Sequence, residues 1–408
     1  MQYFDCELAI ALGTRNQQPG KGGDDERKGT QPMTAMFPLV SPPPTAYLND
    51  LLVRIAVSLQ LTPTQYRDAV RHYEAVAKWL SAADSPLARF LPGIFPQGSL
   101  RIGTTVRPLG RDEYDLDLVC ELLAMLGFHD PVWVLDLVER RLRAHGTYGP
   151  MVERMNRCVR LNFAGQFHLD ILPARPDGAL GGTYLLVPDR RLEDWKPSNP
   201  KGYAAWFDRQ STYRRVAMTR AIEPLPQPEG AEDKTPLQLA VQLFKRWRDV
   251  RYDDPDLAPI SIVLTTLAGT YYLGEEHPLE ALVGIVVRID EAIPVTGRLK
   301  VCNPAHPEED LSERWDRNPA AYRTFVSGIR DLRAKLTSAP SLEGLPRLRE
   351  FLEDLFGEGV ATRALRDQAS TIEGARARGG LTLLSASSGL STVAASGSTL
   401  VRSNTFYD

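Results

Sequence analysis

The most informative stretch of this chain covers residues 95 to 120 and reads FPQGSLRIGTTVRPLGRDEYDLDLVC. Its second half alternates like a β-strand, with Tyr114, Leu116 and Leu118 on one face of that strand. Asp115 and Asp117 then share the other face, although aspartate disfavours strands and neighbouring anions repel each other. The pattern therefore predicts that a cation lies beside the two carboxylates.

Length, composition and charge limit the kind of protein this can be. The 408 residues are enough for two domains with tails, and 43% hydrophobic and 24% charged residues are ordinary for a soluble globular chain. The net charge of −3 gives no general attraction to nucleic acid. Binding of a polyanion would therefore require a local basic patch.

The sequence gives no support for a zinc finger, a disulfide framework or a membrane anchor. The four cysteines are far apart and form no Cys-x-x-Cys pair: Cys6, Cys120, Cys158 and Cys302. No apolar run approaches the roughly 20 residues that cross a bilayer, and the amino terminus lacks the pattern of a secretory signal. We therefore expect a cytoplasmic protein with no membrane contact.

Periodicity and composition divide the chain into four regions. Residues 1 to 36 are rich in Gly, Gln and charge, and we expect them to be disordered. Residues 37 to 215 are predicted to form a mixed sheet backed by helices, and residues 216 to 365 a helical domain. Residues 366 to 408 are rich in Ser, Gly, Ala and Thr, which favours a flexible tail. The expected fold class is α+β.

A third aspartate lies on another predicted strand of the same domain. The residues RCVRLNFAGQFHLDILPAR (157 to 175) read as two strands around a short turn, with Asp170 on the polar face of the second. If the strands are neighbours, Asp170 converges with Asp115 and Asp117. Carboxylates are ligands that Mg²⁺ prefers, and two such ions roughly 3.5–4 Å apart can support in-line phosphoryl transfer.

A possible phosphate-binding turn precedes the aspartates. Gly98 allows the backbone to approach a phosphate closely, and Ser99 adds a hydroxyl. Taken alone, Gly-Ser is typical of a simple turn and Asp-x-Asp of a solvated strand edge. Their order along the chain, followed by Asp170, favours a phosphoryl-transfer site.

These residues also carry a family resemblance. The run QGSLRIGTTVRPLGRDEYDLDL, with LDI at 169 to 171, resembles the nucleotidyltransferase core of the bacterial CD-NTases. These enzymes are related to cyclic GMP–AMP synthase and 2′-5′-oligoadenylate synthetase within the polymerase-β-like superfamily. The resemblance continues in EDWKPSNPKGYAAWF (193 to 207), KRWRD (245 to 249) and APISIVLTTLAGTYY (258 to 272). It implies a polymerase-β-like core with a mixed sheet and a helical second lobe similar to the oligoadenylate synthetase C-terminal domain.

The resemblance implies a role for each matching residue. Asp115, Asp117 and Asp170 would hold two Mg²⁺ or Mn²⁺ ions, and Asp170 would also help to activate the ribose hydroxyl of the acceptor nucleotide. The implied nucleotide-binding residues are Gly98, Ser99, Lys245 and Ser261 at the donor phosphates, and Ser198 and Asn199 near a nucleobase. From the sequence alone, Lys245 could also lie on a solvated helix face, Ser261 could cap a helix, and residues 198 to 200 could be a turn.

The implied activity is the joining and cyclisation of nucleoside triphosphates, ATP among them, into a cyclic di- or trinucleotide second messenger for anti-phage (CBASS) signalling in the bacterial cytoplasm. A downstream effector would receive the product. A HORMA-type regulator or a ubiquitin-like conjugation pair would act through the C-terminal tail, although Asp408 at the end argues against conjugation. Scattered cysteines and the net charge of −3 argue against a DNA activator.

Two kinds of rival function remain open at this point. One is another enzyme on the same core, either a nucleotidyltransferase that makes linear oligonucleotides or one that modifies a small molecule. The first would favour a basic, aromatic-bearing track for a nucleic-acid strand, and we find none in the sequence. The other is an inactive module that senses nucleotides, which would have no reason to keep three strand aspartates.

Overall fold

The structure is a computed structural model, and it describes residues 44–107, 113–124, 130–211, 234–342 and 344–378. Beyond these it describes three short strands, β10 (Thr382–Leu384), β11 (Gly389–Ser391) and β12 (Thr399–Leu400). The N-terminal segment that we expect to be disordered, residues 1 to 36, lies outside the described residues.

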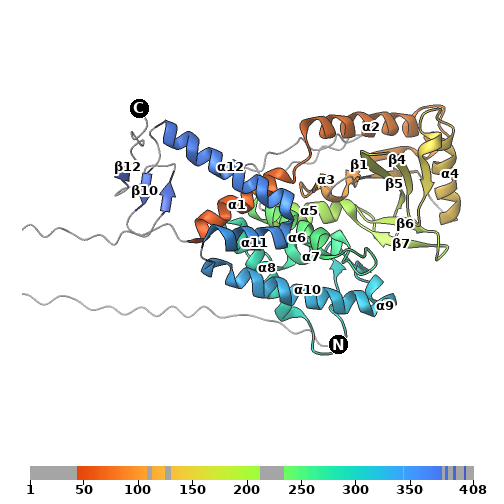
Figure 1. Cartoon of the computed structure of the whole chain (residues 1–408). Coiled ribbons are helices and arrows are strands. Elements are labelled where there is room, and N and C mark those ends of the chain that lie inside the picture. The colour runs from red at the N-terminus through yellow and green to blue at the C-terminus, as the bar shows by residue number, and fades with distance from the viewer. Residues whose placement is uncertain are drawn as a thin grey trace, which may run out of the picture. The chain divides into compact units, whose positions relative to one another are not determined.

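A mixed sheet carries the aspartates, as the sequence predicts (Figure 1). Its strand order is β1-β2-β5-β4-β3, and β6 pairs with both β5 and β7. The strands are β1 (Pro92–Gln97), β2 (Tyr114–Leu122), β3 (Val152–Arg154), β4 (Val159–Phe163), β5 (Phe167–Pro176), β6 (Leu185–Asp189) and β7 (Asp194–Ser198). Strand β2 runs parallel to β5, and the other neighbours are antiparallel.

Helices α2 (Pro63–Ser81) and α4 (Pro131–Arg143) cover one face of this sheet. A capping box starts α2, because the Thr62 and Gln65 side chains each accept a hydrogen bond from the other's backbone N–H, as the sequence predicts. Leu116 and Leu118 of β2 belong to the core beneath these helices. The alternation of β2 therefore leaves Asp115 and Asp117 on the opposite face.

Short elements connect the strands and the helices. They are the helix α3 (Gly98–Arg101) and the 3-10 turns η1 (Ala88–Phe90), η2 (Gly149–Met151) and η4 (Ala339–Ser341). A hairpin of β8 (Cys302–Asn303) and β9 (His306–Asp310) precedes the one-turn helix α9 (Arg314–Arg317). This hairpin reaches the site described below.

The remaining helices surround a second hydrophobic core. They are α1 (Pro44–Ser58), α5 (Pro200–Gln210), α6 (Pro236–Arg251), α7 (Ser261–Tyr271), α8 (Pro278–Ala292), α10 (Pro319–Ser338), α11 (Leu345–Phe356) and α12 (Glu358–Ala377). Trp247 and Phe244 of α6 are among the largest fully buried side chains of this core. Because α1 and α5 share it, segments from both sides of the sheet region in the sequence pack with the helices.

The structure differs from the sequence prediction at the C-terminal tail. Helix α12 extends to Ala377, so the tail that was predicted to begin at residue 366 is helical over its first 12 residues. Residues Ala364 and Ala375 of α12 are buried, so small residues here pack helices closely rather than loosen the chain. The predicted boundary between residues 215 and 216 falls in the stretch 212–233, which lies outside the described residues.

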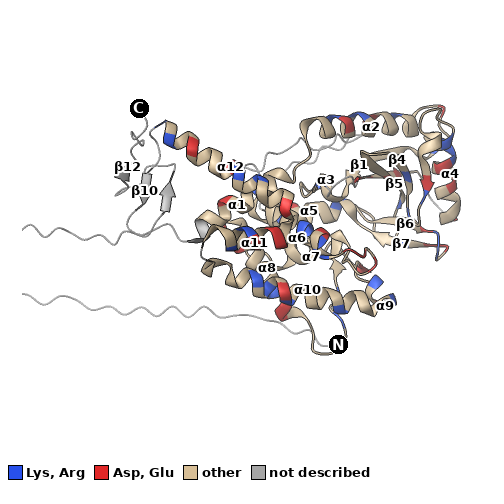
Figure 2. Ribbon diagram, in the orientation of Figure 1, with Lys and Arg blue, Asp and Glu red and all other residues tan. Residues whose placement is uncertain are grey.

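Charged side chains of both signs are interspersed along the described helices, for example along α2 and α10 (Figure 2). None of the described helices combines the length and the apolar character that a membrane span requires.

Candidate active site

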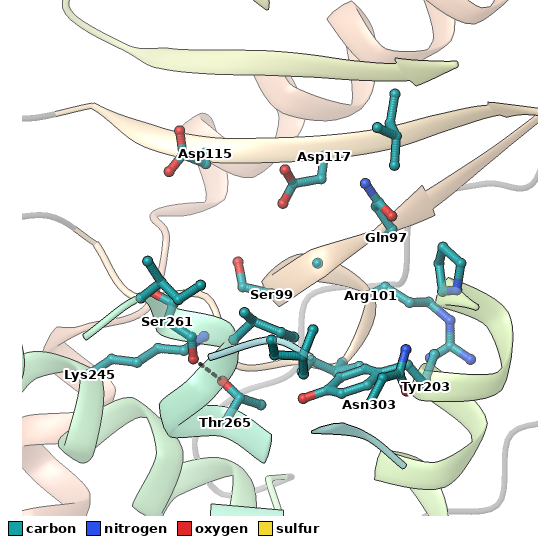
Figure 3. Close-up of a pocket in the computed structure, with 18 of the residues that line it drawn as sticks. Gln97, Ser99, Arg101, Asp115, Asp117, Tyr203, Lys245, Ser261, Thr265 and Asn303 are labelled. Carbon is teal, nitrogen blue, oxygen red and sulfur yellow. Dashed lines mark hydrogen bonds between the residues drawn. The ribbon is translucent and has the colours of Figure 1, made fainter. Parts of the chain in front are cut away.

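A pocket of about 550 Å³ lies on the open face of the sheet, between β2 and helices α6 and α7. In Figure 3, Asp115 and Asp117 project from β2 on one side, and Lys245 and Ser261 lie on the other. The hairpin β8–β9 adds Asn303 and Glu309 to its wall. The volume suits a nucleotide-sized ligand.

Gly98 and Ser99 both line this pocket at the end of β1. Gly98 has a φ of +67°, and a Cβ at this position would lie 2.1 Å from Oδ2 of Asp117. Only glycine meets both conditions, because a side chain is strained at this φ and would collide with the carboxylate. The Ser99 hydroxyl lies 3.1 Å from the Thr105 hydroxyl.

The three predicted aspartates are neighbours in the sheet. Asp117 is the register partner of Asp170 across the parallel pair of β2 and β5. Burial raises the pKa of Asp117 to about 7, and the charges of Asp170 and Asp115 add to the shift. The side chain of Asp115 is 60% exposed to solvent. The cluster therefore holds more negative charge than its surroundings compensate.

Asp170 differs from the other two aspartates because its carboxylate forms a bidentate ion pair with an arginine. Arg160 of β4 donates from Nε to Oδ1 at 2.7 Å and from Nη2 to Oδ2 at 2.8 Å. Asp115 and Asp117 line the pocket, whereas Asp170 lies beside it under this ion pair. The sequence analysis expected these three carboxylates to converge, which they do in the sheet, and it missed the arginine.

The donor set suits a hard divalent cation in part. Among the described residues, no three His, Cys, Asp or Glu side chains are grouped closely enough to hold a metal ion unaided. Mg²⁺, however, commonly takes one or two carboxylates and completes its shell with water and substrate phosphate. Asp115 and Asp117 offer such a pair at the pocket, where burial and then the charges of Asp170 and Asp115 raise the pKa of Asp117.

Helix α6 holds the loop that follows the Gly98–Ser99 turn. Gln238 Nε2 donates to the carbonyl of Ile102 at 3.1 Å, and Gln242 Nε2 donates to that of Thr105 at 2.6 Å. One turn further along, Lys245 donates to both the carbonyl and the hydroxyl of Thr104, each at 3.1 Å. This row, spaced by four and three residues, lies on one face of the helix.

Lys245 lines the pocket and is only 5% exposed. Burial lowers the pKa of its ammonium to about 7, and the nearby charge of Arg248 contributes. It does not lie on a solvated helix face, which was the alternative that the sequence left open. A bound anion would favour its charged form.

Ser261 also lines the pocket, as the first residue of α7. The helix cap is Ile260, so Ser261 is not the capping residue considered from the sequence. Its hydroxyl accepts a hydrogen bond from Nη1 of Arg248, which pairs with Asp249 as well. The sequence analysis missed Arg248, although it lies one turn after Lys245 in the KRWRD segment and lines the pocket.

Of the two residues expected near a nucleobase, only Ser198 lines the pocket. Asn199 is 3% exposed and both ends of its amide are engaged. Its Oδ1 accepts from the backbone N–H of Gly202 and caps α5, and its Nδ2 donates to the carbonyl of Ala305. In the structure Asn199 therefore ties α5 to the β8–β9 hairpin.

Sequence comparison shows which family the chain belongs to. Residues 46–210 match the family model for the Second Messenger Oligonucleotide or Dinucleotide Synthetase domain. The chain is 34% identical over 343 residues to a protein of Roseivirga ehrenbergii named c-di-GMP synthase, covering 81% of this chain and 90% of the relative. The chain belongs to the bacterial CD-NTase family.

Other CD-NTases support the same assignment. The cyclic dinucleotide synthase CdnG of Bradyrhizobium diazoefficiens is 29% identical over 352 residues, 78% of this chain and 82% of CdnG. The solved structure of CdnG with GTP aligns with a TM-score of 0.64 and 26% identity, covering 79% of this chain and 99% of that one. E. coli MS115-1 CdnC, solved with ATP, shares the fold at 14% identity and a TM-score of 0.57, over 76% of this chain and 97% of CdnC.

Family membership confirms three predictions made from the sequence. The chain is a CD-NTase, its fold is the α+β nucleotidyltransferase fold with a mixed sheet, and it is an enzyme of the nucleotidyltransferase class. The roles of the individual site residues remain predictions.

Proposed function

We propose that this CD-NTase joins two nucleoside triphosphates and closes them into a cyclic dinucleotide by metal-assisted phosphoryl transfer. The observation that carries the proposal is the juxtaposition of the Gly98–Ser99 turn with Asp115 and Asp117 on one pocket face. The names of the 34% identical c-di-GMP synthase and of the cyclic dinucleotide synthase CdnG support the class of product. We place the enzyme in the bacterial cytoplasm.

Each group of residues then has a chemical task. Gly98 lets the backbone approach the donor triphosphate, while Ser99, Lys245, Arg248 and Ser261 face it with donors and positive charge. Asp115 and Asp117, joined by Asp170 once it leaves Arg160, would hold divalent cations, Mg²⁺ or Mn²⁺, which when bound stabilise charge on the attacking and leaving oxygens.

Proton removal falls to the third aspartate in this scheme. Asp170 lies one strand away from Asp117, in register with it, and would accept the proton of the attacking ribose hydroxyl. Its present ion pair with Arg160 would have to loosen before it could do so.

We propose that the substrate includes GTP, because the β8–β9 hairpin adds a further carboxylate, Glu309, to the pocket lining. Glu309 accepts one hydrogen bond, from Nδ2 of Asn303 at 2.7 Å, and forms no ion pair within the described chain. Guanine offers two adjacent donors, N1–H and N2–H, that a carboxylate can accept together. Adenine offers an acceptor at N1, which a carboxylate repels.

Glu309→Gln is expected to weaken the preference for GTP over ATP by about tenfold or more, because a charge-assisted pair of hydrogen bonds is lost. Titration of the protein with non-reactive GTP and ATP analogues measures this preference. Glu308→Gln is the matched control, since the adjacent Glu308 is exposed and does not line the pocket. An unchanged preference in Glu309→Gln would remove Glu309 from base recognition.

The decisive test of the function is the product. Purified protein with labelled ATP, GTP, CTP and UTP plus Mg²⁺ or Mn²⁺ should give phosphatase-resistant cyclic dinucleotide, with guanine incorporated. Asp115→Asn should fold and give none. A ladder of oligomers would support a linear polymerase, and binding without any product would support a nucleotide-sensing module. Product from Asp115→Asn would contradict the proposed site.

A signalling role extends the same proposal. The product would pass to an effector in anti-phage defence, and a HORMA-type regulator would act on the C-terminal tail. One structural relative at 13% identity, E. coli MS115-1 CdnC, was solved as a CdnC:HORMA-deltaN complex, and that likeness concerns the fold alone. Deletion of residues 379 to 408 tests this role. The full chain should change its product yield when a HORMA-type regulator is added, and the shortened chain should not.

A further inference from the structure

Arg160 stands out among the residues around the aspartates because the proposed reaction gives it no task. It faces Asp170 directly in the antiparallel pair of β4 and β5. Both carboxylate oxygens of Asp170 accept from its guanidinium, at 2.7 and 2.8 Å, and its Nη2 also lies 3.5 Å from Oδ1 of Asp115. The two paired side chains are 21% and 15% exposed.

This arginine is the counter-ion of the cluster. Of the described residues, no other Lys or Arg forms an ion pair with any of the three aspartates. A bidentate pair of this kind takes one lone pair on each oxygen of Asp170, so a metal ion has fewer free positions on that carboxylate. A guanidinium within about 4 Å would also repel a divalent cation, and partial burial of the pair reduces screening by solvent.

We propose that Arg160 is a built-in counter-ion that competes with divalent cations for Asp170. In the nucleotide-free protein it offsets part of the negative charge of the cluster and keeps cation affinity low. Nucleotide phosphates supply further oxygen ligands, and their charge favours the divalent cations over the arginine, so Asp170 is released when substrate and metal arrive together. Arg160 is thus a positioning residue, and the inference rests on the metal-dependent reaction proposed above.

The test measures cation binding directly, without turnover. Full-length protein is titrated with Mn²⁺, and free Mn²⁺ is followed by electron paramagnetic resonance. The titration is done without nucleotide and with a GTP analogue that has a methylene bridge between the α and β phosphorus atoms. The variants are Arg160→Gln, which removes the charge, and Arg160→Lys, which keeps the charge and loses the bidentate geometry.

Without nucleotide, Arg160→Gln is expected to bind Mn²⁺ at least about tenfold more tightly than the wild type, and Arg160→Lys to fall between them. The matched control is Arg143→Gln. Arg143 pairs with Glu139 on α4 at 2.7 Å, away from the aspartates, so its loss removes the same charge from the chain and should leave Mn²⁺ affinity unchanged. With the GTP analogue present, the difference in Mn²⁺ affinity between Arg160→Gln and the wild type should become smaller.

A Mn²⁺ affinity that is unchanged or weaker in Arg160→Gln would overturn the inference. It would mean that Arg160 does not compete with the cation for Asp170. If Arg160→Gln shows no cooperative thermal unfolding and is therefore not folded, the Mn²⁺ affinity of Arg160→Lys relative to the wild type decides instead. The failure of the proposed function looks different. In that case the wild type would bind no Mn²⁺ even with the analogue, and it would give no product.

Discussion

Asp117→Asn should lower the rate of product formation by at least about 10³-fold and should raise the melting temperature of the protein. The loss follows because Asp117 lines the pocket floor beside Gly98, where a neutral amide is a poor ligand for a hard cation. The gain follows because the folded protein holds a half-buried anion, Asp117, beside Asp115 and Asp170, which costs free energy of folding. An increase of roughly 2 °C or more is expected above pH 7.

The raised pKa of Asp117 also makes the free energy of unfolding depend on pH. The pKa of Asp117 is about 7 in the folded protein and 3.8 in an unperturbed chain. Between these values the folded state holds a proton that the unfolded state has lost, so the free energy of unfolding falls as pH rises from about 4 to about 7. Asp117→Asn should remove this part of the pH dependence. A variant that melts lower than the wild type at pH 8 would contradict the account, even if it were inactive.

Gly98→Ala should reduce product formation by about 10²-fold or more while the protein still folds. The new Cβ would lie 2.1 Å from Oδ2 of Asp117, so the carboxylate must leave its position. A displacement of this size at a reacting centre commonly costs on the order of 10²-fold. The φ of +67° adds about 1–2 kcal/mol of backbone strain for alanine.

The chain offers a control that separates the two effects. Gly181 has the same φ of +67°, and a Cβ there would meet no atom within 4 Å. Gly181→Ala should therefore lose similar stability in thermal unfolding and keep its activity. If both alanine variants lose activity equally, strain and not contact with Asp117 explains the effect at Gly98.

Part of the site could be predicted because strand periodicity is a local property. The alternation around Asp115 and Asp117 fixes which face they share, and the hairpin around residues 164 to 166 puts Asp170 on a strand next to β4. The parallel pairing of β2 with β5, which brings Asp170 beside Asp117, is non-local and was only a condition in the sequence analysis. The same hairpin contained a signal that we did not use. Arg160 and Asp170 lie five residues on either side of Gly165, so a symmetric hairpin pairs them directly.

Other features depend on tertiary packing and had no local signal. The two amide ends of Asn199 are used by Gly202 and by Ala305, which is more than 100 residues away in the chain. Glu309 reaches the pocket only because a short hairpin between helices is folded toward the sheet. The helical residues 366 to 377 were misread because alanine and arginine in a Ser- and Gly-rich context do not reveal whether a partner helix is present.

The bonds from α6 to residues 102–105 limit how this enzyme can open and close. Two glutamines and a lysine bind that loop to α6, and the Gly98–Ser99 turn is the first half of the short helix α3 that leads into it. Gly98 also lies against Asp117 of β2, so the turn is held both by the helices and by the sheet. Any separation of the helices from the sheet would have to break one of these two sets of contacts.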